Sequence, residues 1–178
     1  MDIDRQVATA LGFPKADYVS VEREGRWLCR DVPHERVERT EAITDLYVAG
    51  TRLRLREARR MDGGAPMLRL SRKADVDQHT RLITSIYLSE EEFAVLAAVL
   101  PGVRVRKIRH RLQSPPGVLL SLDVFQGGLD GLIMVEAEFK TQQLMTAFPM
   151  PDFAFREVTD DLRFTGARLA EHGLPNDR

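Results

Sequence analysis

Acidic residues stand in pairs, two positions apart, near both ends of the patterned part of the chain. Glu22 and Glu24 form the first pair, and Glu136 and Glu138 form the second. Residues two apart in a strand share one face, so each pair would present two carboxylates in one direction. If the two strands lie side by side, the four carboxylates form a cluster of hard oxygen ligands suited to Mg²⁺ or Mn²⁺.

Basic residues alternate in the same way along the intervening segments. They are Arg52, Arg54 and Arg56, then Arg69 and Lys73 with Ser71 between them, and then Lys107, Arg109 and Arg111. For a single strand, a solvated charged face is the common explanation. Like charges facing one another across a sheet are destabilising, so the whole set is better explained by a bound anion. Arginine forks bind phosphate oxygens, and a carboxylate cluster beside them suits a metal-bound polyphosphate.

The elements that must position these side chains are mostly strands. Period-two patterns predict strands at residues 18–29, 42–48, 51–60, 67–73, 80–88, 103–112, 118–125 and 132–140. Turn residues separate many of them, so we expect a mainly antiparallel sheet. If this sheet curls shut, the first and last strands meet and the charges line its interior.

Helices are expected at four places outside this pattern. A short helix is predicted in the first dozen residues, ending at Gly12, and a brief one at residues 141–147. Ser89 and Glu92 form a capping box, which predicts a helix that ends before Pro101. The closing helix is predicted to begin near Thr159 and to fray before Gly173.

Composition predicts one globular domain over residues 1–178, with its core at about 18–172. Hydrophobic residues make up 43% and charged residues 30%, and the net charge of -1 argues against a generally basic nucleic-acid binder. The one cysteine, Cys29, cannot form an intrachain disulfide. No signal peptide and no apolar run of roughly 20 residues is visible. We therefore expect a cytoplasmic protein without a membrane partner, which could form a homodimer.

In order and spacing, these residues resemble the CYTH family, also called triphosphate tunnel metalloenzymes. Glu22-Arg23-Glu24-Gly25-Arg26 resembles the family's opening Glu-x-Glu-x-Lys. The later matches are Arg52-Leu53-Arg54, Leu70-Ser71-Arg72-Lys73, Lys107-Ile108-Arg109, the hairpin residues around Asp123, and Val135-Glu136-Ala137-Glu138-Phe139. The resemblance covers residues 18–172, so it extends over nearly the whole chain.

The resemblance implies a closed antiparallel barrel of about eight strands, mainly β with flanking helices. It implies a tunnel that binds a triphosphate-containing small molecule together with Mg²⁺ or Mn²⁺. The implied metal ligands are Glu22, Glu24, Asp123, Glu136 and Glu138; the implied substrate-binding residues are Arg26, Arg52, Arg54, Lys73, Arg81 and Arg109; and Lys107 is the implied catalytic residue.

Two departures from the family pattern concern the chemistry of the site. Arg26 stands where the family usually has lysine, and arginine cannot accept a proton at neutral pH. After Arg81, the positions that often hold carboxylates are Ile83 and Ser85. The second departure weakens the case for a second metal ion and for any particular substrate.

Three functions are compatible with this pattern. The first is metal-dependent hydrolysis of inorganic triphosphate or a related compound. The second is a class IV adenylate cyclase that makes cyclic AMP from ATP, and the third is a module that binds polyphosphate or nucleotide without turnover. We favour hydrolysis, with tripolyphosphate a better substrate than ATP, because the sequence specifies no pocket for adenine. A nucleic-acid partner is not expected.

Overall fold

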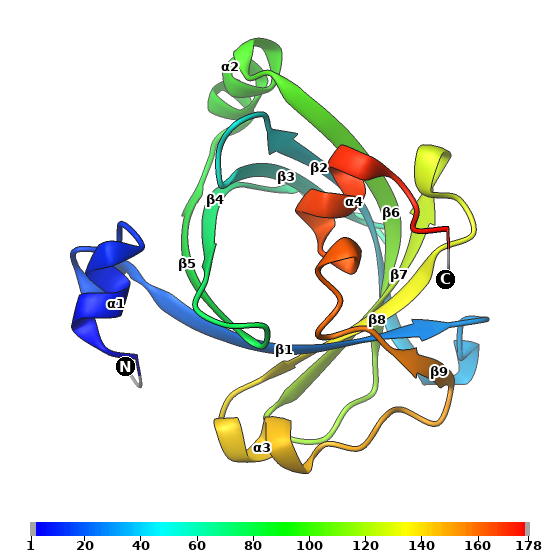
Figure 1. The fold of residues 1–178 in the computed structure, drawn as a ribbon. Helices are drawn as coiled ribbons and strands as arrows, with labels where there is room; N and C mark the ends of the chain where they lie inside the picture. Colours follow the sequence, from blue (N-terminus) through cyan, green and yellow to red (C-terminus); the bar gives the residue numbers. More distant parts are fainter. Residues whose placement is uncertain (1–2, 177–178) are drawn as a thin grey trace.

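The computed structural model describes residues 3–176, which form one curved sheet with helices at its surface (Figure 1). The strands are β1 (Ser20–Cys29), β2 (Val37–Val48), β3 (Leu53–Arg60), β4 (Met67–Asp75), β5 (Thr80–Tyr87), β6 (Gly102–Leu112), β7 (Val118–Gln126), β8 (Ile133–Phe139) and β9 (Ala154–Glu157). The helices are α1 (Arg5–Ala10), α2 (Glu90–Val99), α3 (Gln142–Ala147) and α4 (Gly166–His172). Every strand pairing is antiparallel.

The sheet closes into a barrel because its two ends meet at β1. The strand order is β5-β4-β3-β2-β6-β7-β8-β1-β9, and β5 also pairs with β1. Strands β1 to β8 therefore form the closed ring seen in Figure 1, and β9 follows β5 along the same edge of β1. The predicted antiparallel barrel is confirmed.

Hydrophobic side chains on the outer face of the barrel pack against the short helices. Trp27, Val135 and Phe139 of β1 and β8 are buried beneath Leu144 and Phe148, in and just after α3. A second hydrophobic cluster contains Phe164 and Leu169, and it connects the C-terminal segment to the mouth of the barrel. Because apolar burial is the main favourable term in folding, these contacts fix α3 and α4 against the barrel that carries the charged interior.

The C-terminal part departs most from the sequence-based expectation. The predicted closing helix begins at Gly166 instead of near Thr159, and β9 precedes it. The reason is a buried contact with β1. The Arg26 amide donates to Thr159 Oγ1 at 3.0 Å, and its guanidinium donates to the Thr159 carbonyl at 2.7 Å. These hydrogen bonds hold Thr159 against β1 in the turn that follows β9, so the helix begins later in the chain.

The other differences are smaller. Strand β2 begins at Val37, earlier than expected, because β6 extends to Leu112 and pairs with it there. The helix expected in the first dozen residues is present as α1, and the capping box of α2 is formed by Ser89 and Glu92 as expected. Within residues 3–176, no helix is long and apolar enough to cross a membrane.

Candidate active site

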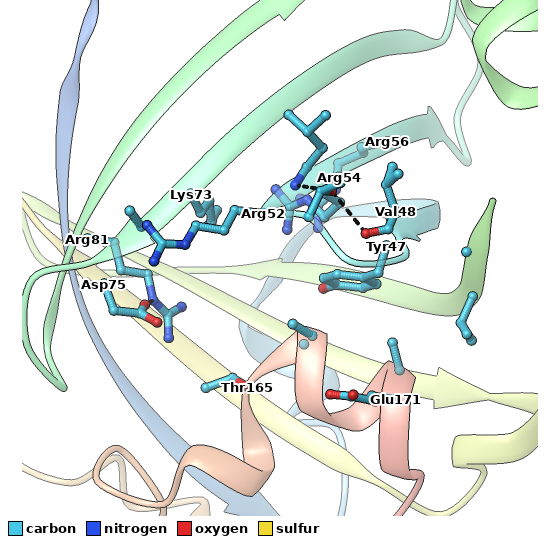
Figure 2. Close-up of a pocket in the computed structure, with 18 of the residues that line it drawn as sticks. Tyr47, Val48, Arg52, Arg54, Arg56, Lys73, Asp75, Arg81, Thr165 and Glu171 are labelled. Carbon is cyan, nitrogen blue, oxygen red and sulfur yellow. Dashed lines mark hydrogen bonds and ion pairs between the residues drawn. The ribbon is translucent and has the colours of Figure 1, made fainter. Parts of the chain in front are cut away.

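The barrel encloses a cavity of about 560 Å³, which is lined by charged side chains from most of its strands. Figure 2 shows Arg52, Arg54, Lys73 and Arg81 on one side of this cavity, and Thr165 and Glu171 on the other. Thr165 immediately precedes α4 and Glu171 lies within it, and α4 stands at the mouth of the barrel in Figure 1. The cavity is therefore a charged interior with one helix at its entrance.

The two Glu-x-Glu pairs lie on neighbouring strands, as the sequence predicts. In the pairing of β1 with β8, Glu24 stands opposite Glu138, and Arg26 opposite Glu136. The four glutamates Glu22, Glu24, Glu136 and Glu138 all line the cavity. We call this set the carboxylate wall.

Cations reach three of these four glutamates. Lys73 Nζ lies 2.6 Å from Glu22, Arg81 Nη1 lies 2.5 Å from Glu24, and Arg109 Nη2 lies 2.9 Å from Glu136. Glu138 makes no hydrogen bond or ion pair with any residue between 3 and 176. The carboxylate wall is thus partly neutralised, with one carboxylate left over.

The pKa values of the carboxylate wall divide into two groups. Burial raises the pKa of Glu24, which Arg81 only partly offsets, and burial together with the charge of Glu22 raises the pKa of Glu138. Burial also acts on Glu22 and Glu136, but Lys73 lowers the pKa of Glu22, and Lys107 and Arg109 lower that of Glu136. Ionised Glu24 and Glu138 are therefore the members that a bound cation would relieve most.

Opposite this set, β3 and β4 supply a cationic wall, which consists of Arg54, Arg56 and Lys73. Behind it lies Asp45 of β2, whose side chain is fully buried. Asp45 accepts from Arg56 Nε at 2.6 Å and from Arg56 Nη2 at 2.7 Å, and it lies 3.6 Å from Arg54 Nε. Burial alone would raise the pKa of Asp45, but Arg56 and Arg54 hold it far below its usual range.

Comparison with known proteins relates this barrel to triphosphatases. The chain is 38% identical over 85 residues to an inorganic triphosphatase from Nitrosomonas europaea, a match that covers 48% of this chain and 56% of that protein. The matched region thus spans only about half of that relative's length. The chain also matches the crystal structure of an inorganic triphosphatase at 27% identity and a TM-score of 0.57, over 84% of this chain and 93% of the other.

A third similarity concerns the fold alone. A protein from Pyrococcus horikoshii is 23% identical, with a TM-score of 0.56 over 70% of this chain and 82% of the other. No protein-family model matches the sequence. The closed eight-strand barrel and its similarity to these two solved structures identify the fold. This chain has the triphosphate tunnel fold. The resemblance to the triphosphate tunnel metalloenzymes is confirmed. We therefore refer to the cavity as the tunnel.

The donor chemistry of the tunnel fits a divalent metal ion. Carboxylate oxygens are the ligands that Mg²⁺ and Mn²⁺ prefer, and the carboxylate wall leaves Glu138 unpaired. Across residues 3–176, however, no three carboxylate, histidine or cysteine side chains are gathered closely enough to hold an ion. Glu22, Glu24 and Glu136 point to cations instead, so metal binding requires them to exchange these ion pairs.

Asp123, the fifth predicted metal ligand, is fully buried and holds two cations. Lys107 Nζ lies 2.5 Å from Asp123 Oδ2, and Arg109 donates from Nε and Nη2 to its two oxygens, each at 2.6 Å. Asp123 does not line the tunnel. The structure therefore favours a role in which Asp123 positions Lys107 and Arg109.

Lys107 lines the tunnel from β6 with little exposure, 5% of the residue. Burial lowers its pKa, the Asp123 carboxylate opposes this shift, and Arg109 adds to it. The Lys107 ammonium also lies 5.2 Å from the centre of the Phe125 ring. A lysine with a lowered pKa beside a phosphate site can release a proton more easily than an ordinary lysine.

Two predicted substrate-binding arginines lie at unexpected places. Arg26 is 1% exposed and does not line the tunnel; it binds Thr159, and its Nε and Nη1 have no hydrogen-bond partner among the described residues. Arg52 lies in the turn before β3, exposed at the tunnel mouth. Arg56, which is only 3% exposed, is the deeper member of this arginine series.

Sequence reasoning missed three residues of the barrel interior. Asp45 stands alone among apolar neighbours on the inward face of β2, and this isolation between two basic strands was its only signal. Tyr47 and Phe125 line the tunnel. Burial, and then Asp45, raise the pKa of Tyr47 to about 12, and a side chain at Gly166 would place its Cβ 1.9 Å from the Tyr47 hydroxyl. Glycine at the start of α4 thus permits a close approach to Tyr47.

Proposed function

We propose that this chain hydrolyses inorganic triphosphate, or a closely related triphosphate, inside the tunnel with Mg²⁺ or Mn²⁺. The observation that carries the proposal is the enclosed tunnel in which a carboxylate wall faces a cationic wall. The similarity to inorganic triphosphatases supports it. An enclosed site strengthens electrostatic interactions with a polyanion because little water competes.

In this proposal the cations bind the phosphate oxygens. Arg54 and Arg56 extend from β3, Lys73 from β4 and Arg109 from β6, so they reach the substrate from several directions. Arginine forks suit phosphate oxygens, and Arg52 and Arg81, which also line the tunnel, add positive charge to this set. Substrate binding would break the ion pairs that join Lys73 to Glu22 and Arg81 to Glu24. The two glutamates would then be free to bind metal.

The four glutamates of the carboxylate wall are the proposed metal ligands. A bound divalent cation would offset charge on the phosphate oxygens during transfer to water. The exchange of partners explains how the same glutamates can be paired with Lys73, Arg81 and Arg109 in the free protein. Asp123 would support this arrangement indirectly, by holding Arg109 and Lys107.

Lys107 is the proposed proton acceptor for the attacking water. A positioned base contributes to such a step, and Arg26 cannot provide it. Lys73 is the other lysine in the tunnel. Each lysine is paired with a carboxylate, but Lys73 is the more exposed, at 26% of its side chain against 6% for Lys107. In the alternative role, Lys107 only binds a phosphoryl group.

A nucleotide cyclase is the second candidate, and the aromatic residues of the tunnel bear on it. Phe125 is 3% exposed and lies against Lys107, and the Tyr47 hydroxyl abuts α4. The buried Phe125 ring therefore offers no free face on which adenine could stack. A module that only binds polyphosphate is the third candidate. Cytoplasmic location and a homodimer remain predictions from the sequence.

The test is a panel of tripolyphosphate, ATP and pyrophosphate, each with Mg²⁺, with Mn²⁺ and with EDTA. We expect phosphate release to be fastest from tripolyphosphate and to stop in EDTA. Cyclic AMP is measured in the ATP samples, and its formation would favour the cyclase. Tight tripolyphosphate binding in calorimetry without phosphate release would show a binding module instead.

A further inference from the structure

Among the described cations of the tunnel, Arg69 and the exposed Arg52 are the two whose side chains make no hydrogen bond or ion pair. Arg69 lies on β4, opposite Arg56 of β3 and Tyr87 of β5, and it lines the tunnel. Within residues 3–176 its side chain makes no hydrogen bond or ion pair, and its Nε is buried without a hydrogen-bond acceptor.

Apart from the exposed Arg52, the neighbouring cations of the tunnel are compensated by carboxylates. Arg54 and Arg56 share Asp45, and Lys73 is paired with Glu22. Across the tunnel, Lys107 and Arg109 share Asp123. Arg69 therefore adds an uncompensated positive charge beside the cationic wall, whose nearest carboxylate, Asp45, is already bound by two arginines.

This arrangement carries an energetic cost in the free protein. A charge removed from water without a counter-charge is unfavourable, and like charges across a sheet are also unfavourable. Burial, then Arg56 and Arg54, lower the pKa of Arg69 to about 10. An anion placed against Arg69 would remove this cost, so the site favours an anionic ligand over an empty tunnel.

The place of Arg69 along β4 indicates which part of the ligand it meets. Arg69, Ser71 and Lys73 share the inward face, so Arg69 and Lys73 are about 13 Å apart along the strand. Lys73 reaches the carboxylate wall through Glu22. Arg69 lies away from that end, and the serine pair between them, Ser71 and Ser85, is hydrogen-bonded at 2.8 Å and uncharged.

We propose that Arg69 binds a phosphoryl group beyond the three of triphosphate, so that the tunnel also takes linear tetrapolyphosphate. This inference rests on the proposed function, because it assumes that a triphosphate unit occupies the tunnel beside the carboxylate wall. Arg69 then acts as a specificity residue for chain length. The same chemistry could bind free orthophosphate, which the experiment below separates.

The experiment compares Arg69→Met with Arg106→Met, a matched change at an exposed arginine on the outer face of β6. kcat/KM is measured for tripolyphosphate and linear tetrapolyphosphate with Mg²⁺. We expect Arg69→Met to lower the tetrapolyphosphate value about tenfold or more, the size of one charged hydrogen-bonded contact. The tripolyphosphate value should stay within about threefold, and Arg106→Met should change neither.

Equal effects on both substrates, or a wild-type protein that does not bind tetrapolyphosphate, would overturn the inference. If Arg69→Met only weakens inhibition by orthophosphate, Arg69 binds free phosphate and the chain-length role is wrong. If the wild type hydrolyses neither substrate, the proposed function fails. Calorimetric affinities for the two polyphosphates, compared between wild type and Arg69→Met, then still test Arg69 alone.

Folding of the variant is tested separately by its melting temperature without ligand. Because Arg69 has no carboxylate partner, Arg69→Met should melt at the same temperature as the wild type or higher. A clear decrease in the melting temperature would mean that Arg69 supports the barrel itself, and this outcome would also count against the inference.

Discussion

The two walls of the tunnel are both charged, but they are neutralised in different ways. In the cationic wall, Arg54 and Arg56 are bound from behind by Asp45, which does not line the tunnel. In the carboxylate wall, Glu22 and Glu24 are bound by cations from β4 and β5, which themselves line the tunnel.

This difference indicates which parts of the site are fixed. A buried charge pair behind the wall holds its arginines in place whether or not a ligand is present. Pairs between tunnel-lining side chains must break when a polyanion takes the cations and a metal ion takes the carboxylates. The cationic wall is therefore preorganised, which favours tight binding, and the carboxylate wall is exchangeable.

The largest effect is expected from removing the anchor of the cationic wall. Asp45→Asn leaves Arg54 and Arg56 buried without a counter-charge, and removing one partner of a buried pair costs about 3–5 kcal/mol. The free energy of unfolding, measured by urea titration at neutral pH, should fall by this amount. Asp62→Asn, which removes an exposed partner of Arg60, is the control and should change little. Similar small losses in both variants would contradict the anchoring role.

The next effect separates a base from a phosphate-binding cation. Lys107→Arg retains the positive charge but cannot release a proton at neutral pH, so turnover should fall about 100-fold or more. The affinity for tripolyphosphate, measured by calorimetry, should stay within a few fold. Lys73→Arg is the matched control, because Lys73 belongs to the cationic wall. Normal turnover in Lys107→Arg would rule out its base role, and a collapse only in Lys73→Arg would move that role to Lys73.

The alternating charges made the fold and the carboxylate wall predictable. Period two places Glu22 with Glu24, and Glu136 with Glu138, on single faces, and closure of the barrel sets the two strands side by side. The tunnel position of Lys107 and Arg109 follows from the same alternation. Local spacing was sufficient because each strand keeps its side-chain alternation through the barrel.

The rest depended on contacts between distant parts of the chain. Asp45 gains its role only when β3 brings Arg56 against it, and Thr159 is held in its turn by Arg26, which is 133 residues away. Whether a cation is compensated also cannot be read from spacing: Arg54 and Arg69 look alike in the sequence. Only the folded barrel gives one a carboxylate and leaves the other without one.

The smallest effect tests the division within the carboxylate wall, using Glu138→Gln with Glu136→Gln as its counterpart. Burial and Glu22 raise the pKa of Glu138 in the folded protein, so its ionisation costs stability as the pH rises through that pKa. Lys107 and Arg109 outweigh burial and lower the pKa of Glu136, so its charge contributes stability that is lost as the pH falls through the folded pKa.

At neutral pH without divalent metal, Glu138→Gln should therefore increase the free energy of unfolding by about 1 kcal/mol, because the amide avoids an unpaired buried charge. Glu136→Gln should decrease it by about 1–3 kcal/mol, the size of a hydrogen bond to a charged group. Urea titrations between acidic and neutral pH should show both differences shrinking toward low pH, where the wild-type carboxyls become protonated. If the two variants shift the free energy of unfolding in the same direction, Glu136 and Glu138 are equivalent, and Glu138 is not the unpaired member of the carboxylate wall.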